Sequence, residues 1–555
     1  MRPSARLRRS LLLLAACLLP PLALAEKQTV CTITINSADE QQTFRRYLPA
    51  DKYRFVELVE RNRPEWLASA SACEAKVSCD VLVISGHHGE GNVFFSDSLT
   101  KQEFLPIEEL ERVSCSGSCP SLFANLKEVY LFGCNTLNPQ PQHTISGEVA
   151  RSYLREGKSG EEASRLARLL GQQRGESSRD RMRVLFKDVP VVYGFSGVAP
   201  LGPVAGSVLN RYFQSSGISE VGKGRPSSAL LRQFSSHGMV AARGISAGDP
   251  LSPLRQDVCM FADDRMAPAQ RLAAIQGLLQ RPVAESRLLL DRIERFTDSL
   301  TASERAQPEV AQALERLAND KASRDRYLAF ARDADQAVTR ARMIDVAQDL
   351  GWLSGSQRRE ELVKMFGDVL ARKDVAGPDV DLACALNKNG DLDGALDGIA
   401  AQARGGGVGQ TAVLACMGRA EARERVLEAL VSPSDADVRI AQAYLRYRPI
   451  ADANELRVTT RAIARMSAPE AQARALDVLA RHYLSDQETV QTLEQLFAKT
   501  RSWPVQNAIA GVLIRADRKS IASPELLRTL RENRLKPSPG DNMVDALIQR
   551  LQESS

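Results

Sequence analysis

The sequence predicts an α/β sandwich, a mostly parallel sheet covered by helices, followed by an all-α helical-repeat solenoid. Three observations support this architecture. From residue 26 to about 250, short β-branched or wholly apolar runs alternate with helical segments. From about Ala267 the strand signals stop and amphipathic helices follow one another. In that second region, buried-type residues recur every 33 or 34 positions, a spacing typical of stacked helix pairs.

In the first region, the strands and helices alternate as expected for parallel βαβ units. The strand at 80–84 is wholly apolar, which is typical of a parallel sheet that is covered on both faces. The predicted strands are 30–35, 80–84, 126–132 and 189–194, and the predicted helices lie at 64–76, within 147–186 and at 204–213.

The helical region has the character of a HEAT-like solenoid. Its clearest predicted helices span 359–372, 435–447, 469–483, 488–499 and 504–515. Two sets of positions recur at the repeat spacing, namely Ala441, Ala475 and Ala508, and Leu445, Leu479 and Val512. We therefore expect four parts, which are a signal peptide at 1–25, an α/β domain at 26–250, a proline-containing linker at 251–268 and the solenoid at 269–555.

Composition and charge exclude several classes of protein. Of the 555 residues, 44% are hydrophobic and 25% are charged, which excludes a mostly disordered or collagen-like chain and a bundle of membrane helices. The formal net charge is +5, but four arginines lie before residue 10, and the other basic residues nearly balance the 68 acidic ones. Charge therefore gives no argument for nucleic acid or an anionic membrane as the main partner.

The first 25 residues are typical of a secretion signal. A basic stretch precedes an apolar run that ends in an Ala-x-Ala pattern before Glu26. An alternative is lipoprotein processing at Cys17, which would leave a lipid anchor. No later segment has 18 uninterrupted apolar residues, so we expect a periplasmic or secreted protein without stable insertion in a membrane.

Ten cysteines in an exported chain predict disulfide bonds. Nine remain without Cys17, and an odd number leaves at least one thiol free or paired between chains. Cys115 could pair with Cys119, and Cys73 with Cys79, because few residues separate the members of each pair. These four could instead bind zinc, but their irregular spacing and the oxidising compartment favour disulfides.

Two of the predicted strands end in residues with catalytic chemistry. The strand at 80–84 is followed by Ser-Gly and then His87, His88 and Gly89, and the strand at 126–132 is followed by Gly and then Cys134. The carboxyl ends of neighbouring parallel strands line the ligand crevice, so a histidine and the cysteine can face each other there. A thiol nucleophile with an imidazole base needs this arrangement.

The motifs resemble the caspase-like cysteine peptidases, most closely their CHAT branch. Four segments carry the resemblance, which covers about residues 77–215: His88-Gly89, the run from Phe94 to Leu110, Cys134-Asn135-Thr136, and Val189 to Phe195. The resemblance implies a caspase-like sandwich and an endopeptidase acting on protein or peptide substrates. It implies Cys134 as the nucleophile, His88 as the base and the amides of Gly89 and Cys134 as the oxyanion donors. It implies no cofactor and no metal.

The chain departs from the family pattern in several places, one of which is the inserted Cys115–Cys119 loop, which fits an exported member. About fifty residues separate the cysteine strand from the Val-Pro strand, two histidines stand where one is needed, and Ser196-Gly197 replaces a frequent tryptophan. Cys134 as the nucleophile also makes it our choice for the unpaired thiol.

Several alternatives remain open. Cys134 could be a small buried hydrophobe, and His87 could be the base instead of His88. Asp97 could recognise a basic substrate residue. His87, His88, Glu90 and Cys134 together could hold a metal, although adjacent histidines rarely point at one ion. The main rival function is a non-catalytic interaction scaffold with a degenerate caspase-like domain, and a third is an acyltransferase or another thiol hydrolase. In the peptidase hypothesis, the solenoid recruits a substrate or a regulator.

Overall fold

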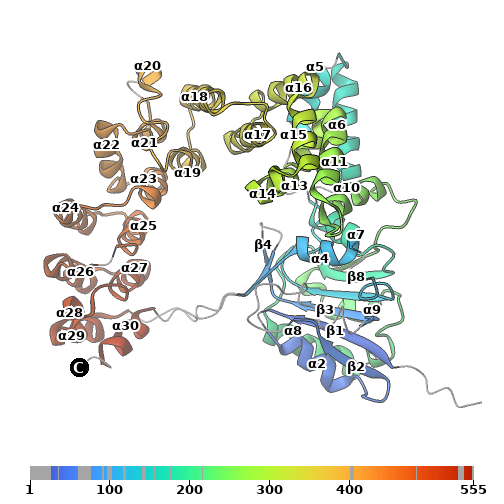
Figure 1. The fold of residues 1–555 in the computed structure, drawn as a ribbon. Coiled ribbons are helices and arrows are strands. Elements are labelled where there is room, and N and C mark those ends of the chain that lie inside the picture. The colour runs from blue at the N-terminus through green and yellow to red at the C-terminus, as the bar shows by residue number, and fades with distance from the viewer. Residues whose placement is uncertain are drawn as a thin grey trace, which may run out of the picture. The chain divides into compact units, whose positions relative to one another are not determined.

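The fold of the protein is taken from a computed structural model (Figure 1). It describes residues 27–35, 37–59, 77–89, 93–96, 103–116, 120–140, 146–155, 157–174, 177–215, 217–400, 406–482, 484–535 and 543–552. The predicted signal peptide, the predicted helix at 64–76, Glu90 and Asp97 lie outside these residues. The chain divides into two compact units, Met1–Leu314 and Glu315–Ser555.

A six-stranded sheet forms the centre of the first unit, with the strand order β2-β1-β3-β7-β8-β9. Neighbouring strands are parallel except β9, which runs antiparallel to β8 at the edge. The strands are β1 (Gln28–Thr34), β2 (Tyr53–Glu57), β3 (Val81–Ser85), β7 (Glu128–Phe132), β8 (Val191–Phe195) and β9 (Met239–Ala242). The mostly parallel α/β sheet predicted from the sequence is therefore confirmed, whereas β2 and β9 were not predicted.

Helices cover both faces of this sheet, and every residue of β3, β7 and β8 is therefore buried. Alternate residues of each strand enter two separate cores. Leu82 and Ile84 pack with helices α4 (Ile107–Cys115) and α7 (Ser178–Leu185), whereas Val81 and Val83 pack with α2 (Asp39–Tyr47) and α8 (Gly202–Ser215). Figure 1 shows these pairs of helices on opposite sides of the strands. The strands are continuously apolar in sequence because both of their faces are buried.

A small antiparallel sheet follows β3 and carries the histidines. It consists of β4 (His87–Gly89), β5 (Val93–Phe95) and β6 (Phe104–Pro106). His88 lies opposite Phe94, and Phe94 lies opposite Leu105. Helix α4 begins at the residue after β6, so this sheet connects the end of β3 directly to one covering helix.

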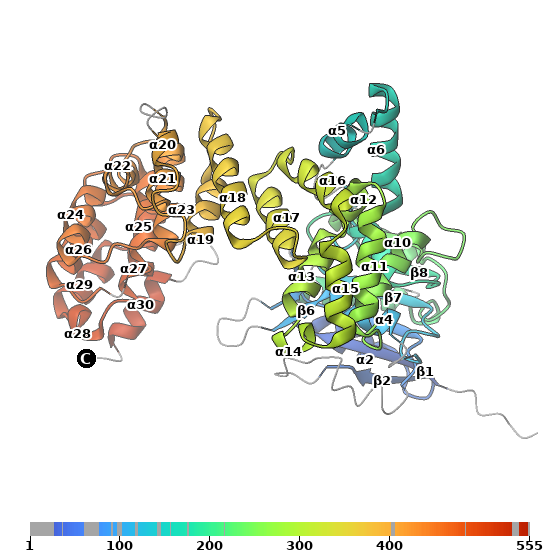
Figure 2. The ribbon, with the colours of Figure 1, turned by 45° about the horizontal axis from the view of Figure 1, so that its top comes forward.

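Further helices belong to the first unit, and two of them, α10 and α13, are bonded to α4. They are α5 (Ser146–Arg155), α6 (Gly160–Arg174), α9 (Ser228–Gln233), α10 (Ser252–Ala262), α11 (Pro268–Gln280), α12 (Val283–Leu288), α13 (Leu290–Ser299) and α14 (Ala302–Arg305). Figure 2 shows α10, α11 and α13 near α4. The segment predicted as a linker therefore contains a helix, α10, and the compact units divide after Leu314. A disulfide and buried ion pairs from α10 and α13 to α4 account for the later division.

Three disulfides lie among the described residues, and they join segments distant in the sequence. Cys31 bonds to Cys79, Cys115 to Cys259 and Cys384 to Cys416. The local pairs expected for Cys115 with Cys119 and for Cys73 with Cys79 are wrong, because Cys115 is bonded to Cys259 on α10 and Cys79 to Cys31 on β1. Such bonds form and persist in oxidising, non-cytoplasmic compartments.

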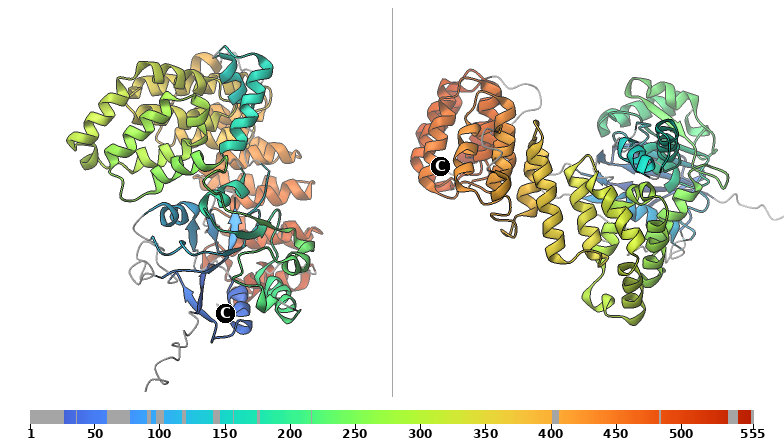
Figure 3. Two further views of the ribbon diagram at one scale, coloured as in Figure 1. Left: turned by 90° about the vertical axis from the view of Figure 1, so that its right-hand side faces the viewer. Right: turned by 90° about the horizontal axis from the view of Figure 1, so that it is seen from above.

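The second unit is built from helices in two rows, which Figures 1 and 3 show side by side. Helices α19, α23, α25, α27 and α30 form one row, and α24, α26 and α29 form the other. The described helices after α15 (Pro308–Ala318) are α16 (Lys321–Arg332), α17 (Ala337–Asp349), α18 (Gly355–Ala371), α19 (Gly377–Leu386), α20 (Asp397–Ala400), α21 (Val408–Cys416), α22 (Ala420–Leu430), α23 (Asp435–Tyr447), α24 (Ala453–Ala464), α25 (Pro469–Leu479), α26 (Gln487–Lys499), α27 (Trp503–Leu513), α28 (Arg518–Ile521), α29 (Pro524–Asn533) and α30 (Met543–Gln552).

The repeat spacing in the sequence has a packing cause. The recurring residues all lie on α23, α25 and α27, which are neighbours, and all are buried: Ala441, Ala475, Ala508, Leu445, Leu479 and Val512. Two buried glutamines add a feature that hydrophobic periodicity did not reveal. The side-chain amides of Gln472 and Gln506 donate hydrogen bonds to the carbonyl oxygens of Ile463 and Phe497, each nine residues earlier. None of the described helices is both long and apolar enough to cross a bilayer.

Candidate active site

The candidate site lies where β3 and β7 end side by side. Ser85 and Phe132 are register partners, and the N–H of Gly86 donates to the carbonyl oxygen of Phe132 at 3.2 Å. The residues that follow these strands must therefore start from the same edge of the sheet. This pairing brings His87, His88 and Cys134 together although 46 residues separate His88 from Cys134.

Cys134 carries a free thiol, whereas the other cysteines among the described residues are all disulfide-bonded. This agrees with its choice as the unpaired thiol. The side chain is partly exposed, and its Sγ atom accepts the backbone N–H of Ala199 at 3.4 Å. The backbone N–H of Cys134 itself has no acceptor among the described residues. The thiol is thus accessible, and two amide groups next to it can stabilise negative charge.

The turn after Cys134 is held in a conformation that few residues adopt. Asn135 has a φ of 57°, in the left-handed region that asparagine tolerates better than most residues. Its N–H donates to the carbonyl oxygen of Gly197 at 2.7 Å. Buried Thr136 donates to the carbonyl oxygen of Gly133 and accepts the N–H of Phe195 at 3.1 Å. The polar pair after the cysteine therefore fixes the loop that carries Cys134 against the end of β8.

His88 is buried and bonded to the backbone of the cysteine. Its Nδ1 atom lies 2.9 Å from the carbonyl oxygen of Cys134, and because a carbonyl only accepts, Nδ1 carries the hydrogen. The ring is 6% exposed and packs on Phe94 with centroids 5.0 Å apart. Burial lowers the pKa of His88, partly opposed by the hydrogen bond to Cys134, so the imidazole is neutral at neutral pH. Gly133 makes this approach possible, because a Cβ there would lie 2.8 Å from the Cβ of His88.

His87 lies on the opposite side of β4 and enters a cavity. Successive strand residues point to opposite faces, so the two histidines cannot occupy the same place. A cavity of about 230 Å³ is lined by Cys134 together with His87, whereas His88 and Gly89 are not among its lining residues. The complete lining is Ser37, Glu40, Gly86, His87, Phe132, Gly133, Cys134, Val198, Ala199, Pro200, Leu201 and Gly202. Of the predicted residues, the structure thus places Cys134 and the alternative base His87 in one cavity.

Glu40 also lines this cavity, although no sequence motif had pointed to it. It is the second residue of α2, which begins just after β1, and its side chain is 3% exposed. Burial raises the pKa of Glu40 from 4.5 to about 7, although its own backbone N–H and the hydroxyls of Ser85 and Ser37 favour the charged form. The Oε2 atom has no hydrogen-bond partner among the described residues. The rule that carboxyl ends of parallel strands line the crevice applied to β1 as well and could have found it.

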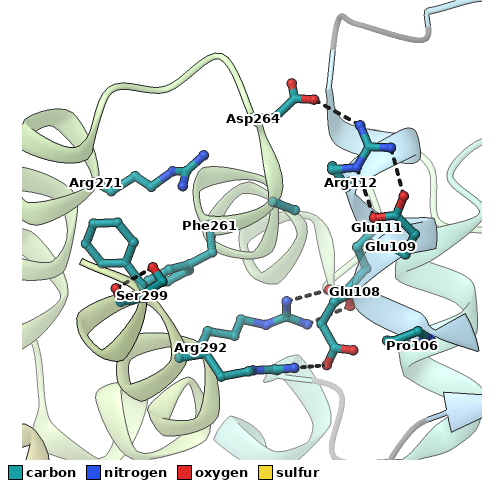
Figure 4. A pocket seen from close by; sticks show the side chains of 13 residues that line it. Pro106, Glu108, Glu109, Glu111, Arg112, Phe261, Asp264, Arg271, Arg292 and Ser299 are labelled. Carbon is teal, nitrogen blue, oxygen red and sulfur yellow. Dashed lines mark hydrogen bonds and ion pairs between the residues drawn. The ribbon is translucent and has the colours of Figure 1, made fainter. Parts of the chain in front are cut away.

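A larger cavity, of about 420 Å³, lies elsewhere in the same unit, on α4 (Figure 4). Its charged groups are largely paired with one another. Arg112 bonds to Glu109 and Asp264, each at 2.9 Å, and Arg292 bonds to Glu111 at 2.6 Å. Its lining contains no cysteine or histidine. The cavity therefore lies between α4 and α10–α13 and offers neither a thiol nor an imidazole, so the smaller cavity is the better candidate.

No group of three or more His, Cys, Asp or Glu side chains among the described residues is arranged to hold a metal ion. Comparisons of the chain with protein-family models, with curated proteins and with solved structures each gave no match. The site itself and the motif resemblance are therefore what indicates a function for this chain.

Proposed function

We propose that the protein is an exported cysteine endopeptidase with a caspase-like α/β unit, acting in the periplasm or outside the cell. The observation that carries the proposal is Cys134. It is the free thiol in a chain whose other described cysteines are bonded, and it lies in a cavity with an imidazole. A protein from an oxidising compartment that keeps one accessible thiol beside a histidine has the requirements of thiol catalysis.

The proposed mechanism uses the two histidines differently. His87 takes the thiol proton, and the Cys134 thiolate attacks the scissile carbonyl carbon. The backbone N–H of Cys134 donates to the oxyanion that forms. His87 then returns its proton to the leaving amine, and a water molecule, deprotonated by the same imidazole, hydrolyses the acyl-enzyme. His88 acts as a positioning residue through its bond to the Cys134 carbonyl oxygen.

The choice of base departs from the motif resemblance, which favoured His88-Gly89. His87 lines the cavity that the thiol lines, and the Nδ1 hydrogen of His88 is already donated to the backbone. Gly89 lies opposite Val93 in the hairpin and does not line the cavity, so the amide of Cys134 is the better supported oxyanion donor. We propose that the helical repeat recruits a substrate or a regulator.

The test is cleavage of a proteome-derived peptide library, read by mass spectrometry under mild reduction. Residues 26–555 would be compared with the Cys134→Ala, His87→Ala and His88→Ala variants. Cuts made by the wild type and absent with Cys134→Ala would support the peptidase. Equal cutting by wild type and Cys134→Ala would end the proposal. No cuts from any folded protein would favour the interaction scaffold, and acyl transfer to an added amine would indicate an acyltransferase.

A further inference from the structure

The cavity beside Cys134 has the size and the walls of a pocket for one substrate side chain. Its volume of about 230 Å³ is below the range of roughly 300–1,000 Å³ for pockets that hold whole small ligands. One wall consists of four consecutive uncharged residues, Val198 to Leu201, and Phe132 is a further apolar residue of the lining. The thiol belongs to the same cavity, so a side chain bound here belongs to a residue next to the attacked bond.

Glu40 is the one carboxyl among the residues that line this cavity, and the lining contains no lysine or arginine. The Oε2 atom is buried without a hydrogen-bond partner among the described residues. An unsatisfied buried polar atom costs on the order of 1–3 kcal/mol, and the cost disappears when a donor arrives. The position therefore favours a ligand that brings hydrogen-bond donors and positive charge.

Lysine and arginine side chains fit this cavity with both their alkyl stem and their charged head. Their alkyl stems pack on apolar surface while the charged head stays at a polar group. An ammonium or guanidinium group at Glu40 would form a charge-assisted hydrogen bond, the stronger kind. A neutral side chain would leave Oε2 unsatisfied, and an acidic one would meet a like charge.

We propose that Glu40 selects substrates with lysine or arginine at the residue before the scissile bond. This inference rests on the proposed peptidase function and names its substrate class. The cavity, the buried carboxyl with one unsatisfied oxygen and the apolar wall carry it. Cleavage takes place at the carbonyl of the basic residue, by the thiol chemistry described above.

The protonation of Glu40 gives the selection a pH dependence. The charged or titratable groups around it are Asp39 on its own helix, His87 on β4 and Cys134 after β7, and the first turn of α8 has no acidic residue. A basic side chain binds the ionised form, whose pKa of about 7 is raised by burial. The preference for basic substrates should therefore increase as pH rises from 6 to 8.

The experiment uses peptides that are identical except before the scissile bond, where they carry arginine, lysine, citrulline, norleucine or aspartate. For the wild type at pH 8, we expect kcat/KM for arginine to exceed that for citrulline about 100-fold, the size expected of a buried charge pair. In Glu40→Gln this ratio should fall to about 1, because the carboxylate that distinguishes a charged from a neutral side chain is gone. Asp39→Asn is the matched control, because Asp39 does not line the cavity, and it should keep the ratio.

Labelling of Cys134 by arginyl and citrullyl chloromethyl ketones, read by intact mass, tests the pocket without turnover. Faster labelling by the arginyl reagent in the wild type alone would support the inference. Cys134-dependent cleavage with equal rates for arginine and citrulline, or a preference that Glu40→Gln retains, would overturn the inference and leave the peptidase standing. If the wild type shows no cleavage and no labelling, both the inference about Glu40 and the proposed peptidase function are overturned. Melting temperature and disulfide mapping establish that each variant is folded.

Discussion

The Nδ1 atom of His88 lies 2.9 Å from the carbonyl oxygen of Cys134 and not in the cavity that the thiol faces. Two adjacent histidines on β4 therefore have different positions, one in the cavity and one against the backbone. We therefore expect different consequences when each of the two side chains is replaced.

Replacing His87 should mainly lower the catalytic rate, whereas replacing His88 should mainly lower the free energy of unfolding. A base contributes about 10²–10⁴-fold, so His87→Ala should lower kcat by that factor and leave the melting temperature nearly unchanged. His88→Ala leaves the Cys134 carbonyl without its donor and should cost about 1–3 kcal/mol of unfolding free energy. Kinetics and thermal melts of both variants are the measurement, with His88→Asn as a donor-retaining control. Wild-type kcat in His87→Ala would contradict its role as base.

Alkylation under native, non-reducing conditions should label Cys134. Cys134 is a partly exposed residue with a free thiol, whereas the other six cysteines of the described residues are bonded in three pairs. Peptide mapping after iodoacetamide should show modified Cys134 and three cross-linked peptide pairs. Recovery of Cys134 in a disulfide-linked peptide would contradict both the free thiol and the nucleophile.

Glu40→Gln should stabilise the first unit at alkaline pH. The pKa of Glu40 is about 7 in the folded protein against the usual 4.5, so the folded state holds the proton more tightly. The unfolding free energy of the wild type therefore falls as pH rises from 4.5 to 7, by at most about 3 kcal/mol, and the variant lacks this loss. Urea-dependent hydrogen exchange of β1 and α2 peptides at pH 5 and pH 8 measures the difference. If the variant is less stable than the wild type at pH 8, burial of the ionised Glu40 carboxylate does not destabilise the folded protein, and the prediction is wrong.

Removing the bond between Cys115 and Cys259 should loosen the connection of α4 to α10. The bond closes a segment of 144 residues, and disulfides over long loops contribute about 2–4 kcal/mol. The double variant Cys115→Ala/Cys259→Ala should exchange hydrogens faster in α4 and α10. The pair Cys384→Ala/Cys416→Ala serves as the control, because its effect should be confined to the second unit. Unchanged exchange in α4 would show that the buried pair Arg292–Glu111 suffices.

Gln506→Leu should destabilise the helical repeat. The Gln506 amide donates to the carbonyl oxygens of Phe497 and Asn533, so the variant leaves two carbonyls without this donor, at about 1–3 kcal/mol. Urea unfolding followed by tryptophan fluorescence is suitable, because Trp352 and Trp503 both lie in this unit. Gln491→Leu on the exposed face of α26 is the control and should have little effect. An equal loss of unfolding free energy in both variants would show that the buried amide of Gln506 makes no particular contribution.

Local patterns were enough to predict most of the regular elements. The strands near 80–84 and 126–132 were recognisable because burial on both faces demands continuous apolar residues, and β3 and β7 lie there. The repeat spacing predicted neighbouring helices because stacked units bury equivalent positions, as Ala441 and Ala475 show. The edge strands β2 and β9 carry weaker patterns, since their residues are only partly buried.

The amino-acid pattern was enough to place a cysteine and a pair of histidines after neighbouring strands, since the ends of parallel strands must meet at one edge. Tertiary structure alone decided which histidine shares the cavity, because that depends on the side of β4 from which each ring projects. It also decided that Cys115 pairs with Cys259 and that Glu40 lines the cavity with Cys134. These relationships join residues far apart in the chain, and only the packing of strands and helices fixes the distances between them.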